Sequence, residues 1–328
     1  MLDSVNATVW RVIVETVYNW EDKNDNNDPF VFNWDYYNQL YATPKYQKAW
    51  DMIAYLNKRG ITKNLMINFM GPIPLWMGGK VVKEKYEDEY IEMLVSFFYY
   101  AKKTKHLQIG LISIMNEPDI ENEGPTVDGE QYARLQRKFI DRMKSFDMGD
   151  IQYVAPDVAG MDNGLKSYIP ALMKDPVVMS KIAHIGLHSY GGYYVDVDSA
   201  LKHSAYPQTD YWMTEWNNWC KGCDDGILGE YNYDFAAKSV GYLLSFYNME
   251  LLRGLYGRDM IVIMSTMLLH PLAIGEYFLM TLLQKPMLSG KTSMRCNKYQ
   301  NLCFPVRGGY LFQNKARVSL YWHFIMKH

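Results

Sequence analysis

Short apolar runs alternate with longer amphipathic segments between residues 9 and 254. The short runs are rich in β-branched and aromatic residues, which favour strands, so we predict strands at residues 9–15, 64–69, 109–112, 151–156, 182–187 and 210–215. The longer segments repeat apolar residues near helical spacing, and they predict helices at residues 44–60, 86–103, 128–146 and 233–253. Regular strand–helix alternation predicts a parallel α/β fold.

Two of the predicted strands lead into a glutamate. The run at 109–112 is followed by Asn116-Glu117-Pro118, where proline helps to end the strand, and the run at 210–215 ends at Glu215. A single glutamate of this kind can also be an ordinary loop carboxylate. However, active sites of (β/α)8 barrels lie at the carboxyl ends of the strands, and the spacing leaves room for about three strand–helix units. Two carboxyl groups at one barrel face are what glycoside hydrolysis requires.

The sequence around each glutamate resembles clan A of the glycoside hydrolases. The motifs are MNEPD at 115–119 and WMTEWN at 212–217, and PLWM at 74–77 resembles a motif of family 30 and related (β/α)8 glycosidases. The resemblance implies that Glu117 is the acid/base at the end of the fourth barrel strand. It implies that Glu215 is the nucleophile at the end of the seventh strand. That retaining chemistry needs no cofactor and no metal.

Further residues at the strand ends are candidates for substrate binding. The resemblance implies that Asn116 binds the sugar 2-OH and that Arg11 lies near the nucleophile. It also implies a His and a Tyr after the sixth strand, with the Tyr hydrogen-bonded to the nucleophile. The candidates are Asn116, Trp76, His188, Tyr190, Trp216 and Arg11. Plain structural roles are the alternatives: packing for Trp76, a structural histidine for His188 and a surface position for Arg11.

The barrel that the resemblance implies is incomplete. The strand at 9–15 matches the second barrel strand, so the first strand is expected to be absent, and the start of the chain shows no signal peptide. Beyond residue 255 no clear period continues, and the eighth strand with its terminal Trp is doubtful. We therefore expect a catalytic barrel of strands 2–7 at residues 1–255 and an aberrant segment at 256–328.

Two explanations of the aberrant segment stay open: an out-of-frame translation, and a divergent or unrelated extension. A single-base shift of the back-translated residues 256–267 permits Trp-x-Gly-Tyr-Asp-Ser-Tyr-Tyr-Val-Asn, which resembles the end of the missing strand. Without the first and eighth strands, the strands at 9–15 and 210–215 are expected to be open edges, unless the β-prone residues 260–264 fill the gap. We expect such a chain to aggregate and to show little activity.

Composition changes this picture little. The formal charge of −2 gives no reason to expect a nucleic acid or an anionic membrane as partner, and no apolar run reaches the ~20 residues of a membrane span. Cys220 and Cys223 have the spacing of a zinc or redox motif, but no second pair follows, so we favour a loop disulfide or free thiols.

We therefore expect a retaining glycosidase that acts as a monomer on a carbohydrate. The resembled family is usually secreted or periplasmic. The competing function is a non-catalytic glycan-binding protein on a degenerate barrel, and a weaker one is an unrelated barrel enzyme, because a fold does not set its reaction.

Overall fold

The computed structural model of the chain describes residues 8–215, apart from 17–19, 25, 27 and 122, and four short strands nearer the C-terminus. The chain divides into two compact units, Met1–Leu282 and Leu283–His328. The predicted helix at 233–253, Trp216, Cys220 and Cys223 lie outside the described residues. The division into segments at residue 255 stays a prediction.

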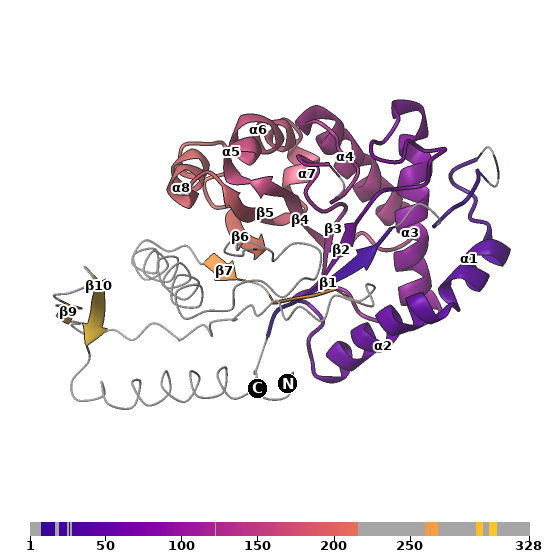
Figure 1. The fold of residues 1–328 in the computed structure, drawn as a ribbon, viewed down its shortest axis with the longest axis horizontal. Helices are drawn as coiled ribbons and strands as arrows, with labels where there is room; N and C mark the ends of the chain where they lie inside the picture. Colours follow the sequence, from indigo (N-terminus) through magenta and orange to yellow (C-terminus); the bar gives the residue numbers. More distant parts are fainter. Residues whose placement is uncertain are drawn as a thin grey trace, which may run out of the picture. The chain divides into compact units, whose positions relative to one another are not determined.

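The first unit contains a parallel sheet with helices beside it (Figure 1). Six consecutive strands pair in chain order, each parallel to the next. They are β1 (Trp10–Glu15), β2 (Leu65–Met70), β3 (Leu111–Ser113), β4 (Gln152–Gly160), β5 (Ile182–Gly191) and β6 (Asp210–Glu215). Parallel neighbours need a crossover connection, and helices supply most of these. The fold is therefore α/β, an incomplete (β/α)8 barrel, as predicted.

Three of the predicted helices are confirmed, as α2 (Pro44–Lys58), α3 (Glu87–Lys103) and α4 (Gly129–Ser145). The start of α4 follows from its cap, because the Asp128 side chain accepts a hydrogen bond from the Gln131 N–H at 2.8 Å. Shorter helical segments were not predicted. They are α1 (Trp34–Tyr41), η2 (Glu84–Tyr86), α5 (Met161–Asn163), η3 (Gly164–Tyr168), α6 (Ile169–Met173), α7 (Pro176–Met179) and α8 (Tyr194–Lys202).

Aromatic side chains form much of the core between the sheet and the helices. The ring of Trp50 in α2 stacks on Phe97 in α3, with ring centroids 4.4 Å apart. Phe97 in turn packs edge-on against Phe69 of β2 at 5.6 Å. Both geometries are favourable for aromatic pairs. This packing anchors the strands whose carboxyl ends carry the candidate site.

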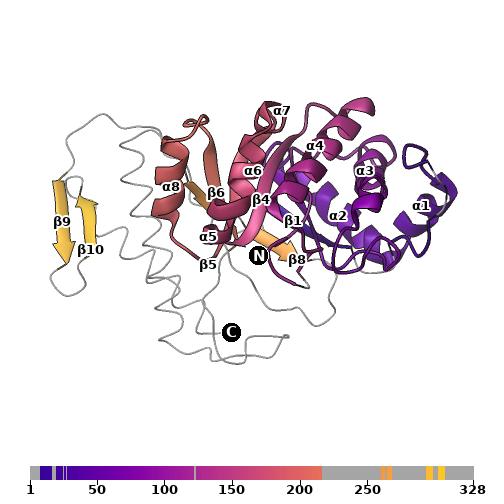
Figure 2. The same ribbon diagram turned by 90° about the horizontal axis from the view of Figure 1, so that it is seen from above.

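The two edges of the six-strand sheet are both paired. β7 (Met260–Val262) runs parallel to β6, and β8 (Met264–Met267) runs parallel to β1 (Figure 2). One residue separates β7 from β8, so a single short stretch of chain pairs with both edges. The expectation of open edges is therefore wrong. The backbone pairing agrees with the alternative, in which residues 260–264 fill the gap.

Several strand ends differ from the prediction. β3 spans Leu111–Ser113, and Glu117, four residues further on, adopts a φ of 40°, in the left-handed region that no strand uses. β4 and β5 run past their predicted ends, to Gly160 and Gly191, which pair with each other. A Cβ at Gly160 or Gly191 would lie 2.7 or 3.0 Å from Oδ1 of Asp162, so the two glycines leave room for this side chain.

The second unit contains an antiparallel pair, β9 (Ser293–Asn297) and β10 (Leu302–Val306), in which Cys296 and Cys303 are register partners. Among the described residues of the chain, no helix is long and apolar enough to cross a bilayer.

Candidate active site

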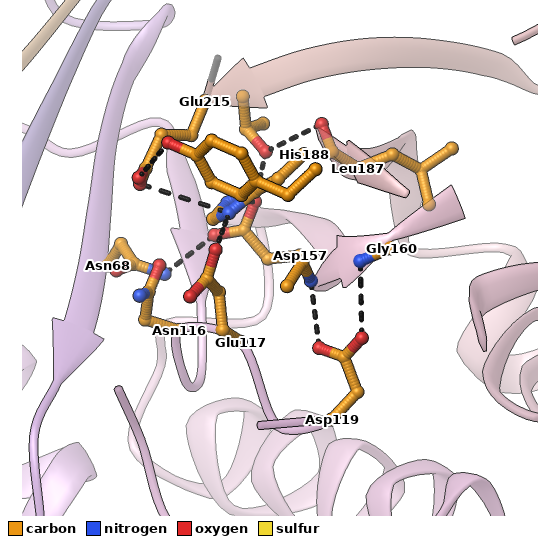
Figure 3. A network of polar contacts seen from close by, with 12 residues as sticks. Asn68, Asn116, Glu117, Asp119, Asp157, Gly160, Leu187, His188 and Glu215 are labelled. Atoms are coloured by element: carbon orange, nitrogen blue, oxygen red, sulfur yellow. Dashed lines mark hydrogen bonds and ion pairs between the residues drawn. The ribbon is translucent and has the colours of Figure 1, made fainter. Parts of the chain in front are cut away.

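Strands of the sheet bring five of the candidate residues, together with Tyr190, into one polar cluster. Four of the five are buried: Arg11 from β1, Asn116 and Glu117 after β3, and His188 from β5. The fifth, Glu215 at the end of β6, has a side chain that is 25% exposed. Tyr190, near the end of β5, is 47% exposed and faces the same cluster. Figure 3 shows Glu117 and Glu215 both directed toward His188.

Glu215 is held by two donors. Arg11 Nη1 donates to its Oε2 at 2.8 Å, and the Tyr190 hydroxyl donates to its Oε1 at 2.8 Å. Burial acts to raise the pKa of Glu215, but the positive charges of His188 and Arg11 and these hydrogen bonds outweigh it and hold the pKa below its ordinary value. Glu215 is therefore an oriented carboxylate at neutral pH.

Glu117 lies opposite in a drier environment, with a side chain only 5% exposed. Burial raises its pKa above the ordinary value, and the charge of Glu215 adds to the rise, while the hydrogen bond from His188 partly opposes it. The Glu117 N–H donates to the Asp157 carbonyl at 3.0 Å, which fixes the backbone in its left-handed conformation. The environment therefore favours the protonated form of Glu117 and the ionised form of Glu215.

The separation of the two carboxyl groups is short. One oxygen of Glu117 and one oxygen of Glu215 lie within 4.8 Å of each other, and Nδ1 of His188 is within the same distance of both. The two carboxyl groups therefore lie beside each other and beside His188.

His188 connects three carboxylates. Its Nδ1 lies 2.5 Å from Glu117 Oε1, and its Nε2 lies 3.4 Å from Asp157 Oδ1. Burial acts to lower the pKa of His188, but the negative charges of Glu215 and Asp157 and the hydrogen bonds to Asp157 and Glu117 raise it to about 10. His188 is therefore an imidazolium at neutral pH, hydrogen-bonded to Glu117 through Nδ1, with Nε2 at ion-pair distance from Asp157.

The most highly connected carboxylate, Asp157, was missed by sequence reasoning. Asp157 lies in β4, is fully buried and accepts hydrogen bonds from Arg11 at 3.0 Å and from Asn68 at 2.7 Å. Burial acts to raise its pKa, but the neighbouring Arg11 and His188 hold it well below the ordinary range. Two signals were present in the sequence: Asp157 directly follows a predicted strand, and Asn68 is the polar residue inside the apolar strand LMINFM.

Two of the proposed sugar contacts are not placed beside the glutamates. Trp76 donates from Nε1 to the Glu21 carbonyl at 2.9 Å, and its ring packs edge-on against Tyr86 at 5.1 Å. These described contacts correspond to the packing alternative for Trp76. Trp216 lies outside the described residues.

A metal ion is geometrically within reach of Glu117, His188 and Glu215, since each offers one ligand atom. These ligand atoms already have protein partners. His188 Nδ1 lies 2.5 Å from Glu117 Oε1, and the two oxygens of Glu215 accept hydrogen bonds from Arg11 and Tyr190. The cations Arg11 and His188 also balance the carboxylates Asp157 and Glu215, so the cluster fits an ion-pair network better than a metal centre.

Comparison with known proteins gives a likeness in structure only. No model of a protein family matches the sequence, and no curated protein matches it. SrfJ from Salmonella typhimurium has a TM-score of 0.50 at 15% identity, covering 67% of this chain and 51% of that chain. The glycoside hydrolase family 30 subfamily 8 xylanase Xyn30A from Clostridium acetobutylicum has a TM-score of 0.42 at 17% identity, covering 66% and 50%. A GH30 endoxylanase from Clostridium papyrosolvens has a TM-score of 0.45 at 13% identity, covering 77% and 64%.

At these identities the likeness concerns the fold alone. The chain resembles SrfJ in fold, and it spans about half the length of the first two of these solved structures.

Proposed function

We propose that this chain is a retaining glycoside hydrolase of clan A, similar to family 30, that cleaves an O-glycosidic bond of a poly- or oligosaccharide. The observation that carries the proposal is the approach of a Glu117 oxygen to within 4.8 Å of a Glu215 oxygen. Retaining enzymes hold their two carboxyl groups about 5–5.5 Å apart, whereas inverting enzymes need about 6.5–9.5 Å to admit a water. The short separation favours direct attack by one carboxylate.

The electrostatics support a division of roles. In the first step Glu215 attacks the anomeric carbon as the carboxylate, and Glu117 gives its proton to the leaving oxygen. Bond formation consumes the charge of Glu215, so the positive charges of Arg11 and His188 are no longer balanced. This excess lowers the pKa of Glu117, which then acts as the base that activates water in the second step.

The remaining residues would position these groups and the sugar. Arg11 and Tyr190 hold the two oxygens of Glu215, which keeps the nucleophile oriented. Asn116 accepts from Arg11 Nη2 through its Oδ1 at 2.5 Å, so its amide nitrogen is the group that would bind the sugar 2-OH. Trp76, Trp216 and the exposed ring of Tyr190 are proposed sugar contacts. We propose a monomeric enzyme that requires no cofactor.

A mechanism-based label tests this proposal. The purified chain is incubated with a panel of activated 2-deoxy-2-fluoro glycosides, and intact-mass and peptide analysis locate any covalent adduct. We expect one adduct, on Glu215, and none in the matched Glu215→Gln variant. An adduct on another residue contradicts the assignment. Saturable binding of oligosaccharides without an adduct supports the alternative, a non-catalytic glycan-binding protein.

A further inference from the structure

Asp157 lies at the centre of the cluster but has no part in the chemistry described above. Its side chain is fully buried, so it cannot touch a sugar that enters from the solvent. It receives contacts from each of the other strands in the six-strand sheet: Arg11 on β1, Asn68 on β2, Ser113 on β3, His188 on β5 and Thr214 on β6. A buried carboxylate with this many donors stays ionised and holds its partners in fixed positions.

Two short chains of contacts lead from Asp157 to the proposed catalytic groups. One passes through Arg11, which binds Asp157 at 3.0 Å and Glu215 at 2.8 Å. The other passes through His188, whose Nε2 lies 3.4 Å from Asp157 and whose Nδ1 lies 2.5 Å from Glu117. In Figure 3, His188 lies between Asp157 and the two glutamates. A single buried charge therefore neighbours both cations of the cluster.

We propose that Asp157 is a positioning residue that keeps His188 doubly protonated and thereby sets the protonation state of the Glu117–His188 pair. The roles of Glu117 and Glu215 in this inference rest on the proposed function, but the contacts themselves do not. With Asp157 ionised, the imidazolium has a buried anion 3.4 Å from Nε2 while Nδ1 hydrogen-bonds Glu117 at 2.5 Å. Without that charge, the pair would lose its first proton at lower pH, because removing a neighbouring anion destabilises every nearby cation and neutral acid.

The charged and titratable groups around this pair are few in the described part of the chain. His188 faces Glu117, Asp157 and Glu215, and the ring of Tyr190 packs edge-on against it at 5.9 Å. Asp157 faces Arg11 and His188, and the charge of Asp157 adds to the effect of burial in raising the pKa of Tyr132 on α4. Tyr132 is neutral at any pH at which the pair titrates. Glu123 also interacts with Glu117 and His188, and burial together with the charges of Glu117 and Glu215 raises its pKa to about 7, so its titration near neutral pH is a background common to the wild type and Asp157→Asn.

Nitrogen NMR of the histidine side chains tests the proposal without any substrate. The chain has 7 histidines, and a His188→Gln variant identifies the His188 signals. In the wild-type chain both ring nitrogens should remain protonated through neutral pH. In Asp157→Asn, which has the same shape without the charge, we expect the midpoint to fall by roughly 1–3 pH units. An unchanged midpoint overturns the proposal.

Ser113→Ala is the matched control, because it removes a hydrogen bond to Asp157 at 3.1 Å but leaves the charge. We expect the His188 midpoint of this variant to stay near that of the wild type. A shift as large as in Asp157→Asn would show that packing, rather than charge, is responsible, and would overturn the proposal. If Asp157→Asn does not fold, the wild-type spectrum decides. A His188 whose Nε2 carries no proton at neutral pH is incompatible with the proposal.

Kinetics separate this inference from the proposed function. If the chain is a glycosidase, Asp157→Asn should move the alkaline limb of kcat/KM to lower pH and reduce kcat, with little change in KM, because Asp157 does not touch substrate. If Glu215 is labelled but the titration midpoint of His188 does not change in Asp157→Asn, the role of Asp157 is refuted and the proposed function is not. If the midpoint of His188 falls in Asp157→Asn but no glycoside labels the chain, the effect of the Asp157 charge on His188 is supported and the proposed function is refuted.

Discussion

Arg11 donates a hydrogen bond to Glu215 at 2.8 Å, although these residues lie on the first and last of six consecutive strands. Neighbouring strands are about 4.8 Å apart, so in a flat sheet these two strands would be about 24 Å apart. The contact therefore requires the sheet to curl until β1 and β6 approach each other, as in a barrel. This curvature is also what brings Glu117 and Glu215 face to face.

Removal of Arg11 should weaken the fold as well as the site. Arg11→Met leaves Asp157 buried without its strongest partner and leaves Glu215 without a cation at 2.8 Å. Breaking a buried ion pair costs about 3–5 kcal/mol, and we expect a loss of this size in urea unfolding followed by circular dichroism. Arg137→Met, which removes an exposed arginine with two acidic partners, is the control and should barely move the midpoint. Equal urea unfolding midpoints for Arg11→Met and Arg137→Met would contradict a stabilising role of the ion pairs of Arg11.

The two glutamates should respond differently to truncation. Glu215→Ala should abolish turnover of every glycoside, because no nucleophile remains. Glu117→Ala should lose several orders of magnitude on substrates with poor leaving groups but retain much of its rate on nitrophenyl glycosides, which need no proton. The measurement is kcat/KM against leaving-group pKa. A loss in Glu117→Ala that does not depend on the leaving group would show that Glu117 is not the acid.

The α/β fold could be predicted from local patterns, whereas the residues of the cluster came from the resemblance of the motifs around Glu117 and Glu215, and their roles stay proposals. The strand carrying Glu215 and the helix capped by Asp128 follow from local patterns, which a single stretch of chain contains. The role of Asp157 could not be predicted, because it depends on contacts from strands that are distant in the sequence. The pairing of residues 260–267 with both sheet edges was only an alternative, because edge pairing depends on where the edges lie.

Tyr190 should tune the acidic limb of activity. Its hydroxyl donates to Glu215 and helps to lower the pKa of that carboxyl, after the larger effects of His188 and Arg11. Tyr190→Phe removes this donor, so the pKa of Glu215 rises and the acidic limb of kcat/KM should move to higher pH by about 1 unit. Tyr193→Phe, three residues further along the chain and 72% exposed, is the matched control and should leave the limb in place. A limb that moves equally in both variants, or in neither, would rule out this effect.

The stability of the fold should fall at alkaline pH because of His188. Its pKa is about 10 in the folded chain and about 6.5 when unfolded. A raised pKa means that the stabilisation is complete below about pH 6.5 and is lost as the pH rises toward 10. The free energy of unfolding should fall over this window with a limiting slope of about 1.4 kcal/mol per pH unit. His188→Gln should lack this component, and parallel curves for the two proteins would contradict the raised pKa.

The pairing of β8 with β1 can be tested by one backbone substitution. Ser265 lies in β8 as the register partner of Arg11, and proline there removes the strand N–H and disfavours an interior strand position. If residues 260–267 are an integral part of the fold, Ser265→Pro should open the edge of β1, lower the unfolding midpoint and increase binding of an apolar dye. Ser265→Thr keeps the N–H and favours strand, so it is the matched control. If residues 260–267 do not pair with β1 in solution, the two variants should melt and bind dye alike.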